Sequence, residues 1–312
     1  MSVGEDEHVP VLKHEVLAGL SVRPAGIYVD GTFGRGGHSR AILEQLGPEG
    51  RLLVIDRDPL ALNTAQDLAQ DDSRITVIRG SFGDIEQIAA AQGVLGKVDG
   101  ILLDLGVSSP QLDDAERGFS FLRDGPLDMR MDPESGMSAQ AWINSAEERE
   151  MSRVIVRFGE EKAARRIARA ICAARQKEEI RRTLELADII EAVIPRRGKG
   201  KHPATKTFQA VRIFINNELG ELQTFLDSVL TTLSAGGRLC VISFHSLEDR
   251  MVKRFLRDQS RVDPALSRLP VVPASAEPDM QLIGRAVRGA AAEIDMNPRA
   301  RSAVLRVGEK LA

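Results

Sequence analysis

The residues best suited to chemistry stand where four short apolar runs of the chain end. The first run ends at Asp30 and leads into a turn with four glycines in seven positions, from Gly31 to Gly37. Glycines let a backbone turn sharply and leave no side chain between the backbone and a ligand. The second run ends at Asp56, 22 positions after Gly34. A carboxylate at that place in nucleotide-binding folds accepts hydrogen bonds from the ribose hydroxyls.

The third and fourth runs end beside an aromatic ring and another carboxylate. Phe82 follows the third run and can stack on adenine, and Asp104 ends the fourth. An acid after a strand is more often a helix cap or a turn residue, so each residue alone is weak evidence. The combination of glycines, acid, aromatic and acid at four consecutive strand ends favours a cofactor that contains a nucleoside.

Two cofactors compete for such a site, NAD and S-adenosylmethionine. A dinucleotide site needs the pattern Gly-x-Gly-x-x-Gly, with the pyrophosphate at the helix N-terminus. Counted from Gly34, the third glycine is replaced by Ser39. The spacing of Asp30, Gly34 and Gly36 fits better with the methyltransferase form of the turn, in which no pyrophosphate is bound.

The apolar runs alternate with helical patterns, which predicts an α/β fold with a doubly wound parallel sheet. Strands are predicted at 27–30, 51–56, 75–78, 98–104, 238–244 and 302–307. A helical section over 139–194 interrupts them, and one helix is predicted over 207–233. We therefore expect a discontinuous domain of residues 1–112 and 207–312, with an inserted, mainly helical domain of residues 113–206.

Composition and charge narrow the class of protein. The chain has 312 residues, 43% of them hydrophobic, and no apolar run near the roughly 20 residues that a membrane helix needs. Its N-terminus is polar and acidic, unlike a signal peptide. Two distant cysteines and five histidines show no metal-ligand spacing and suit a reducing cytoplasm. Residues 149–212 carry 17 Lys or Arg against 8 Asp or Glu, which indicates either a phosphate-facing surface or a solvated helical face.

Seven strings in the same order resemble those of the bacterial small-subunit ribosomal RNA cytosine-N4 methyltransferase family. They cover most of the chain and are far more specific than the glycine turn alone. The strings are Asp30-Gly-Thr-Phe-Gly-Arg-Gly-Gly-His-Ser39, Ile55-Asp-Arg-Asp58, Leu102-Leu-Asp-Leu-Gly-Val-Ser-Ser-Pro-Gln-Leu112, Arg117-Gly-Phe-Ser-Phe121, Leu127-Asp-Met-Arg-Met-Asp132, His202-Pro-Ala-Thr-Lys-Thr-Phe-Gln209 and Ser243-Phe-His-Ser-Leu-Glu-Asp-Arg250.

The resemblance implies a class I, Rossmann-like methyltransferase that depends on S-adenosylmethionine and methylates the exocyclic N4 amine of a cytidine. Its substrate would be 16S-type ribosomal RNA, in the decoding region of an assembled small subunit. The implied cofactor-binding residues are Gly36, Gly37, His38, Asp56, Phe82, Asp104 and Gln111. The resemblance also implies a cytoplasmic protein with no membrane partner, and it allows a homodimer.

The catalytic candidates are Asp104, Ser108, Ser109 and His245. The first three occupy the place after the fourth strand where amino-directed methyltransferases often carry Asp/Asn/Ser-Pro-Pro-aromatic, although the second proline and the aromatic are missing here. His245 can face the base or its phosphate. Equally, Ser246 and Asp249 beside it can form a capping box at the start of a helix.

Basic side chains are the candidates for contacts with RNA phosphates. They are Arg165, Arg166, Arg169, Arg196, Arg197, Lys199, Lys201 and Arg250. Two other functions stay open on the sequence alone. One is a methyltransferase of the same fold that acts on another nucleic acid, and the other is a non-catalytic ribosome assembly factor that binds S-adenosylmethionine.

Overall fold

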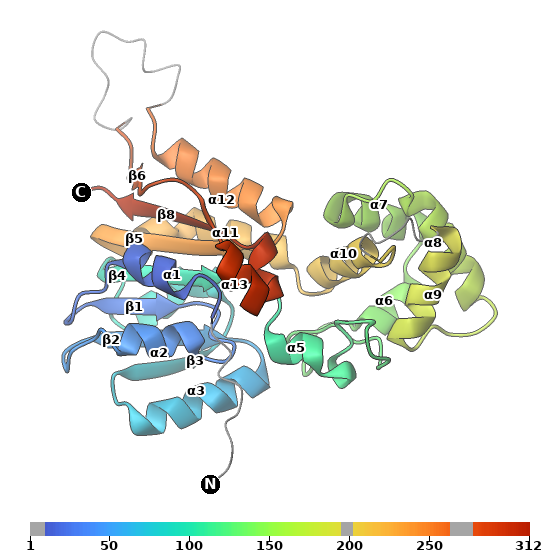
Figure 1. Ribbon diagram of the computed structural model, residues 1–312, viewed down its shortest axis with the longest axis horizontal. Coiled ribbons are helices and arrows are strands. Elements are labelled where there is room, and N and C mark those ends of the chain that lie inside the picture. Colours follow the sequence, from blue (N-terminus) through green and yellow to red (C-terminus); the bar gives the residue numbers. More distant parts are fainter. Residues whose placement is uncertain (1–9, 195–201, 263–276) are drawn as a thin grey trace. The chain divides into compact units, whose positions relative to one another are not determined.

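The computed structural model describes residues 10–194, 202–262 and 277–312 (Figure 1). The chain divides into two compact units. Unit 1 comprises Met1–Gly106 and Leu219–Ala312, and unit 2 comprises Val107–Glu218. The boundaries expected from the sequence, at 113 and 206, therefore differ from those of unit 2 by six residues at one end and by twelve at the other.

Unit 1 is built on one eight-stranded sheet with the order β3-β2-β1-β4-β5-β8-β6, and β7 pairs with β8 beside it. The first five strands along this path are parallel, whereas β8 runs antiparallel to β5, β6 and β7. Their bounds are β1 Ile27–Asp30, β2 Arg51–Asp56, β3 Ile75–Arg79, β4 Val98–Asp104, β5 Leu233–Ser243, β6 Met280–Leu282, β7 Val287–Arg288 and β8 Val304–Lys310. The strand order reverses between β1 and β4, which is where open α/β sheets bind ligands.

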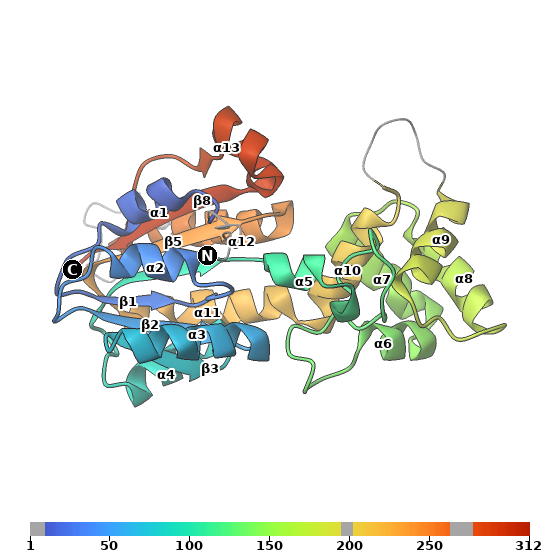
Figure 2. The same cartoon turned by 60° about the horizontal axis from the view of Figure 1, so that its bottom comes forward.

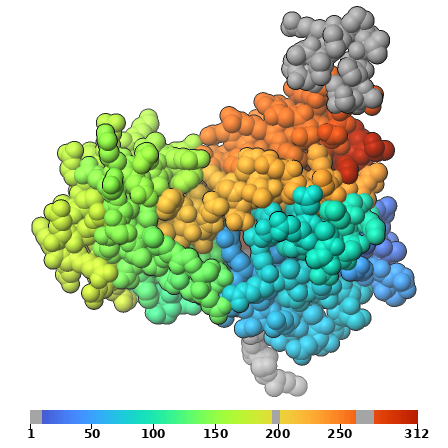
Figure 3. Space-filling model, turned by 180° about the vertical axis from the view of Figure 1, so that it is seen from behind, coloured from blue at the N-terminus to red at the C-terminus, as the bar shows by residue number. Residues whose placement is uncertain are grey.

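Alternate side chains of these strands enter two separate cores, one on each face of the sheet. Tyr28 and Leu52 pack with helices α1 Lys13–Leu20, α2 Gly37–Leu43 and α3 Pro59–Asp71. Val29 and Leu53 pack with α4 Ile85–Ala91, α11 Glu218–Thr232 and α12 Ser246–Gln259, whose outer surface is seen in Figure 3. Burying each such side chain contributes about 1.5–3 kcal/mol. The prediction of a doubly wound α/β sheet is confirmed.

Unit 2 is helical and has its own core (Figure 2). Buried side chains from every long helix meet there, among them Trp142, Ile155, Ile167, Leu186 and Phe208. The helices are α5 Ser109–Asp113, α6 Ala139–Ser145, α7 Glu148–Gly159, α8 Ala164–Arg175, α9 Thr183–Val193 and α10 Thr205–Ile215. None of the helices in the described part of the chain combines the length and apolar character that crossing a bilayer requires.

Two details of the predicted elements were wrong. The helix predicted over 207–233 is two helices, α10 and α11, separated at Asn216 and Asn217. Asn217 adopts φ 49°, a left-handed conformation that asparagine tolerates better than most residues. Apolar spacing runs through the break without interruption, so periodicity could not reveal it. The short strand β6 also lies in a segment that was predicted to be loop.

Asn216 holds the end of α10 to the loop before α6. Its side-chain oxygen accepts a hydrogen bond from the backbone N–H of Met131 at 2.7 Å. Its amide donates to the carbonyls of Met129, at 2.8 Å, and Arg212, at 2.9 Å. The residue is buried, with 6% of its surface exposed, so water cannot replace these bonds.

We expect Asn216→Ala to destabilise the protein by several kcal/mol, because each buried backbone group that loses its partner costs about 1–3 kcal/mol. The free energy of unfolding in urea is the measurement. The neighbouring change Asn217→Gly is the control and should have an effect close to zero, because this side chain is exposed and glycine accepts a positive φ. Equal losses in the two variants would contradict the assigned role of Asn216.

Candidate cofactor site at the carboxyl edge of the sheet

Asp30 organises the turn between β1 and α2. Only 1% of its surface is exposed, and its carboxylate accepts hydrogen bonds from the Thr32 backbone N–H at 3.1 Å and the Ser39 hydroxyl at 2.7 Å. The turn between them needs glycine at two positions with positive φ, Gly34 at 55° and Gly36 at 73°. A Cβ on Gly36 would also lie 2.6 Å from the ring of Phe33. The glycine turn is therefore dictated by its own backbone as well as by any ligand.

Asp56 joins the end of β2 to the same turn. Its two oxygens accept hydrogen bonds from the backbone N–H groups of Gly34 and Asp58, each at 2.9 Å. Burial raises the pKa of Asp56, which these bonds lower in part. Each carboxylate oxygen has further acceptor capacity. Asp56 can thus bind a ribose hydroxyl while it holds the turn.

His38 and Asp104 face each other across the switch point of the sheet. His38 Nε2 lies 3.8 Å from Asp104 Oδ2, too far for a hydrogen bond. Both ring nitrogens of His38 and Oδ1 of Asp104 are buried without a hydrogen-bond partner among the described residues. Buried polar atoms are rarely left in this state in native proteins. These atoms, beside the glycine turn, fit a ligand with polar groups of its own.

Burial also sets the charges of this pair. It lowers the pKa of His38 to about 4, with a smaller contribution from the Lys13 charge. It raises the pKa of Asp104 to about 8, and the charges of Asp30 and Glu248 act in the same direction. At neutral pH the imidazole is therefore neutral, and Asp104 is mainly protonated in the free protein.

Phe82 begins the short helix η1 Phe82–Asp84 after β3. Its ring meets that of Phe225 edge to face, with centroids 5.9 Å apart, and its Cβ would be 3.1 Å from a Cβ placed on Gly31. Ser81 contacts the carboxylate of Glu221 on α11 and accepts a hydrogen bond from the Gly83 N–H at 3.0 Å. The aromatic ring is thus held next to the first glycine of the turn.

Unit 1 brings together six of the seven predicted cofactor residues, all except Gln111. Gln111 belongs to unit 2, where its side-chain oxygen accepts a hydrogen bond from the Ser108 N–H at 3.0 Å and closes a capping box on α5. Ser108 is the N-cap residue of that helix, and Ser109, its first residue, is buried. The roles of Ser108, Ser109 and Gln111 toward a ligand stay predictions.

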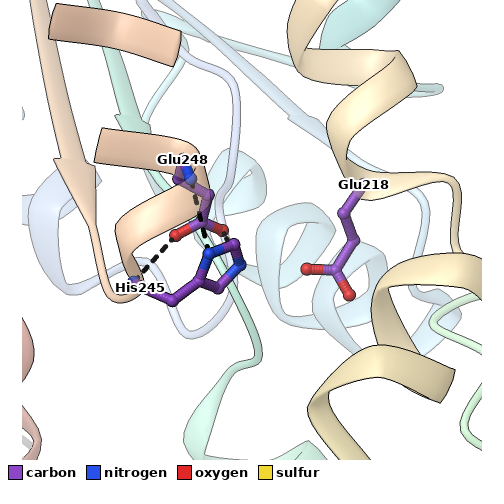
Figure 4. Close-up of side chains that lie close together, drawn as sticks. All are labelled: Glu218, His245 and Glu248. Atoms are coloured by element: carbon purple, nitrogen blue, oxygen red, sulfur yellow. Dashed lines mark hydrogen bonds and ion pairs between the residues drawn. The ribbon is translucent and has the colours of Figure 1, made fainter. Parts of the chain in front are cut away.

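The capping box at the start of α12 was assigned to the wrong residues. The N-cap residue is His245, and its partner is Glu248 (Figure 4). His245 Nδ1 accepts from the Glu248 N–H at 3.4 Å, and Nε2 lies 3.2 Å from Glu248 Oε1. Asp249 instead pairs with Arg306. Figure 4 also draws Glu218, which belongs to unit 2 and accepts two hydrogen bonds from Arg212 there.

Several residues that shape the site were not predicted as site residues. Asp30, Thr32 and Ser39 lie within the glycine string, where their types matched the pattern but their mutual contacts could not be seen. The hydroxyl of Thr32 accepts a hydrogen bond from the Asp104 N–H at 2.6 Å. Only folding brings these positions, 72 residues apart, into contact.

The predicted RNA contacts are only partly described. Arg165, Arg166 and Arg169 are exposed on α8. Arg166 donates to the Val193 carbonyl at 2.8 Å, and Arg169 lies 3.9 Å from Glu148. Arg250 is exposed on α12. The other four, Arg196, Arg197, Lys199 and Lys201, lie outside the described residues.

Comparison with known proteins places the chain. A model of the MraW methylase family matches residues 5–311. The chain belongs to this family. It is also 56% identical over 309 residues to a curated relative from Thiobacillus denitrificans, "Ribosomal RNA small subunit methyltransferase H", with 99% of this chain and 98% of the relative covered. The predicted family is thereby confirmed. A methylase family and a doubly wound sheet together make S-adenosylmethionine the cofactor, as the sequence predicts.

Solved structures show weaker likenesses that concern the fold alone. An rRNA methylase described as putative, from Clostridium thermocellum, has a TM-score of 0.46 at 11% identity, with both chains fully covered. A methyltransferase from Streptococcus mutans, described as putative and in complex with SAH, has a TM-score of 0.43 at 11% identity. The match covers 97% of this chain and 98% of that one.

Ser39→Ala should destabilise the protein by about 1–3 kcal/mol, because the buried Asp30 carboxylate loses a donor. Burial raises the pKa of Asp30 to about 6, above its value in the unfolded chain, so ionisation of Asp30 already weakens folding as pH rises to 6. Without the Ser39 hydroxyl that pKa rises further, and the loss continues to higher pH. The melting temperature from pH 5 to 8 measures this. In an Asp30→Asn background the added pH dependence should disappear, and its persistence would contradict the account.

Proposed function

We propose that this protein transfers a methyl group from S-adenosylmethionine to the exocyclic N4 amine of a cytidine in small-subunit ribosomal RNA. The observation that carries the proposal is 56% identity, along almost the whole chain, to a relative named as a methyltransferase of that RNA. The site geometry supports the same chemistry, because glycines, ribose acceptor, aromatic ring and unpaired polar atoms gather at one edge of the sheet.

The residues of unit 1 divide the cofactor among them. Gly36 and Gly37 let the backbone approach the methionine part, and Asp56 binds the ribose hydroxyls. Phe82 lies against the adenine, while His38 and Asp104 offer their unpaired polar atoms. Gln111 completes the adenine side from the loop after β4. The bound cofactor supplies a methyl group that is already activated by the positive charge on sulfur.

The protein must make a poor nucleophile react. The N4 lone pair is delocalised into the cytosine ring, so alignment of N4 with the methyl carbon is the main requirement, and it can contribute up to about 7–11 kcal/mol. A carbon–nitrogen bond forms, the carbon–sulfur bond breaks, and one N4 proton leaves. Asp104, Ser108 and Ser109 are the proposed acceptors for the amine hydrogens. His245 contributes through the β5–α12 turn, because both its nitrogens face Glu248.

The substrate reaches the protein as shaped RNA. A base inside a stacked helix cannot present N4 to the methyl group, so the target cytidine is single-stranded or flipped. The exposed arginines of α8 supply phosphate contacts, and Arg250 supplies one from unit 1. The proposal includes the decoding region of an assembled small subunit as the target, a cytoplasmic setting and a homodimer.

One experiment tests the reaction. The protein is incubated with S-adenosylmethionine labelled in its methyl group and with small subunits from cells that lack this enzyme, and the labelled nucleotide is identified by mass spectrometry. We expect label on N4 of one cytidine, and loss of most turnover in Asp104→Asn and Ser109→Ala. For Ser109→Ala the affinity for the cofactor should be unchanged.

The outcomes separate the alternatives. Label on another position, or on naked DNA in preference to subunits, would contradict the proposed substrate. Cofactor binding without any label would indicate a non-catalytic binding protein. Full turnover by Ser109→Ala would remove that hydroxyl from the mechanism.

The arginine face of α8 is tested by salt. Methylation of subunits should weaken as ionic strength rises, because the arginines release counterions when they bind phosphates. The double change Arg165→Ala and Arg169→Ala should lower kcat/KM and reduce the slope against log salt by about one for each arginine that binds a phosphate. Arg51→Ala is the matched control, since this exposed arginine begins β2 at the opposite edge of the sheet. A slope unchanged in the double variant would contradict the assignment.

A further inference from the structure

Glu248 is a buried carboxylate whose position has no explanation in helix capping alone. Only 2% of its surface is exposed. Its Oε2 accepts hydrogen bonds from the backbone N–H groups of Phe244, at 2.9 Å, and His245, at 3.3 Å. A serine or aspartate could cap the helix at less cost, because a buried charge is expensive to desolvate.

The carboxylate lies at the end of β5, beside the end of β4. Asp104 pairs with Ile242 in the parallel register, and the Leu105 N–H donates to the Ile242 carbonyl at 3.0 Å. The two residues that donate to Glu248 follow Ile242 almost directly. The ends of β4 and β5 therefore carry two carboxylates side by side, within electrostatic reach of each other.

The groups that face Asp104 come from several elements. His38 on α2 lies 3.8 Å away and is neutral at pH 7, because burial holds its pKa low. Asp30 ends β1 and adds a negative charge, and it is itself coupled to Asp56 on β2. Glu248 on α12 adds another negative charge. Asp30 and Glu248 therefore both oppose the ionisation of Asp104.

We propose that Glu248 is a positioning residue that acts through Asp104: its buried charge keeps Asp104 protonated in the free protein, so that the cationic methyl donor is captured together with loss of that proton. A sulfonium beside Asp104 favours the carboxylate, whereas a neutral thioether does not. Glu248 thereby couples the charge of the cofactor to the protonation of the site. This inference rests on the proposed function for its ligand, but not for its central measurement.

The sign of the pH effect follows from the fold. The pKa of Asp104 is raised to about 8, so the free site is mostly uncharged below that pH and gains its charge above it. Affinity for a cation should therefore rise with pH up to about 8 and then level off. Removing the charge of Glu248 should move this rise to lower pH.

Glu248→Gln is the test variant, because glutamine can still accept from Phe244 and His245 but carries no charge. Asp249→Asn is the matched control, since it removes one charge from the next residue of the same helix, where Arg306 pairs with it at 2.7 Å. Carboxyl carbon resonances of aspartates labelled with carbon-13 are followed from pH 5 to 10 in the free protein. Asp104→Asn identifies the resonance of interest.

We expect the Asp104 midpoint to fall by about one pH unit in Glu248→Gln and to stay in place in Asp249→Asn. At pH 6.5, Glu248→Gln should then bind S-adenosylmethionine several-fold more tightly by calorimetry, up to about tenfold per unit of midpoint shift. Adenosine, which lacks the sulfonium, should bind both proteins equally. The amino group of the cofactor titrates identically in every comparison and cancels.

An unmoved midpoint in a folded Glu248→Gln protein would overturn the inference, and so would an equal shift in Asp249→Asn. Glu248→Asp gives a second variant that keeps the charge. A midpoint in Glu248→Asp equal to that of Glu248→Gln would show that shape rather than charge matters, which would also overturn it. If S-adenosylmethionine does not bind at any pH, the proposed function fails, whereas the titration of the free protein still decides the role of Glu248.

Discussion

The burial of Asp30 is the constraint on which the candidate site depends. A carboxylate with 1% exposure must find donors nearby, and it finds them in the Thr32 backbone and the Ser39 hydroxyl. These bonds close the turn after β1 and orient the first turn of α2. Thr32 then receives the backbone N–H of Asp104. One desolvated acid thus sets the geometry of two strand ends and one helix.

A second consequence concerns charge. The carboxyl edge of the sheet gathers Asp30, Asp56, Asp104 and Glu248, and the nearby His38 is too deeply buried to carry a compensating proton at neutral pH. Such a site is poorly suited to a pyrophosphate and well suited to a cationic ligand. The missing third glycine and the electrostatics of the fold therefore favour the same cofactor by independent physical arguments.

The helical insertion of unit 2 has a core of its own and a polar anchor at Asn216. Its exposed arginines on α8 stand on a helix whose other face is buried among apolar side chains. That arrangement leaves the charged face available for phosphates without any cost to folding. The catalytic chemistry and the recognition of RNA are in this way assigned to separately folded parts of one chain.

The sequence by itself determined the parallel sheet, the glycine turn, the acids at strand ends and the family, because each depends on local pattern or on residues adjacent along the chain. Only the tertiary structure decided which polar groups satisfy one another. The pairing of His245 with Glu248, the break at Asn216 and the reach from Thr32 to Asp104 were not predicted. Apolar periodicity carries no signal for a turn that preserves it, and a hydrogen bond across 72 residues depends on strand order rather than on spacing.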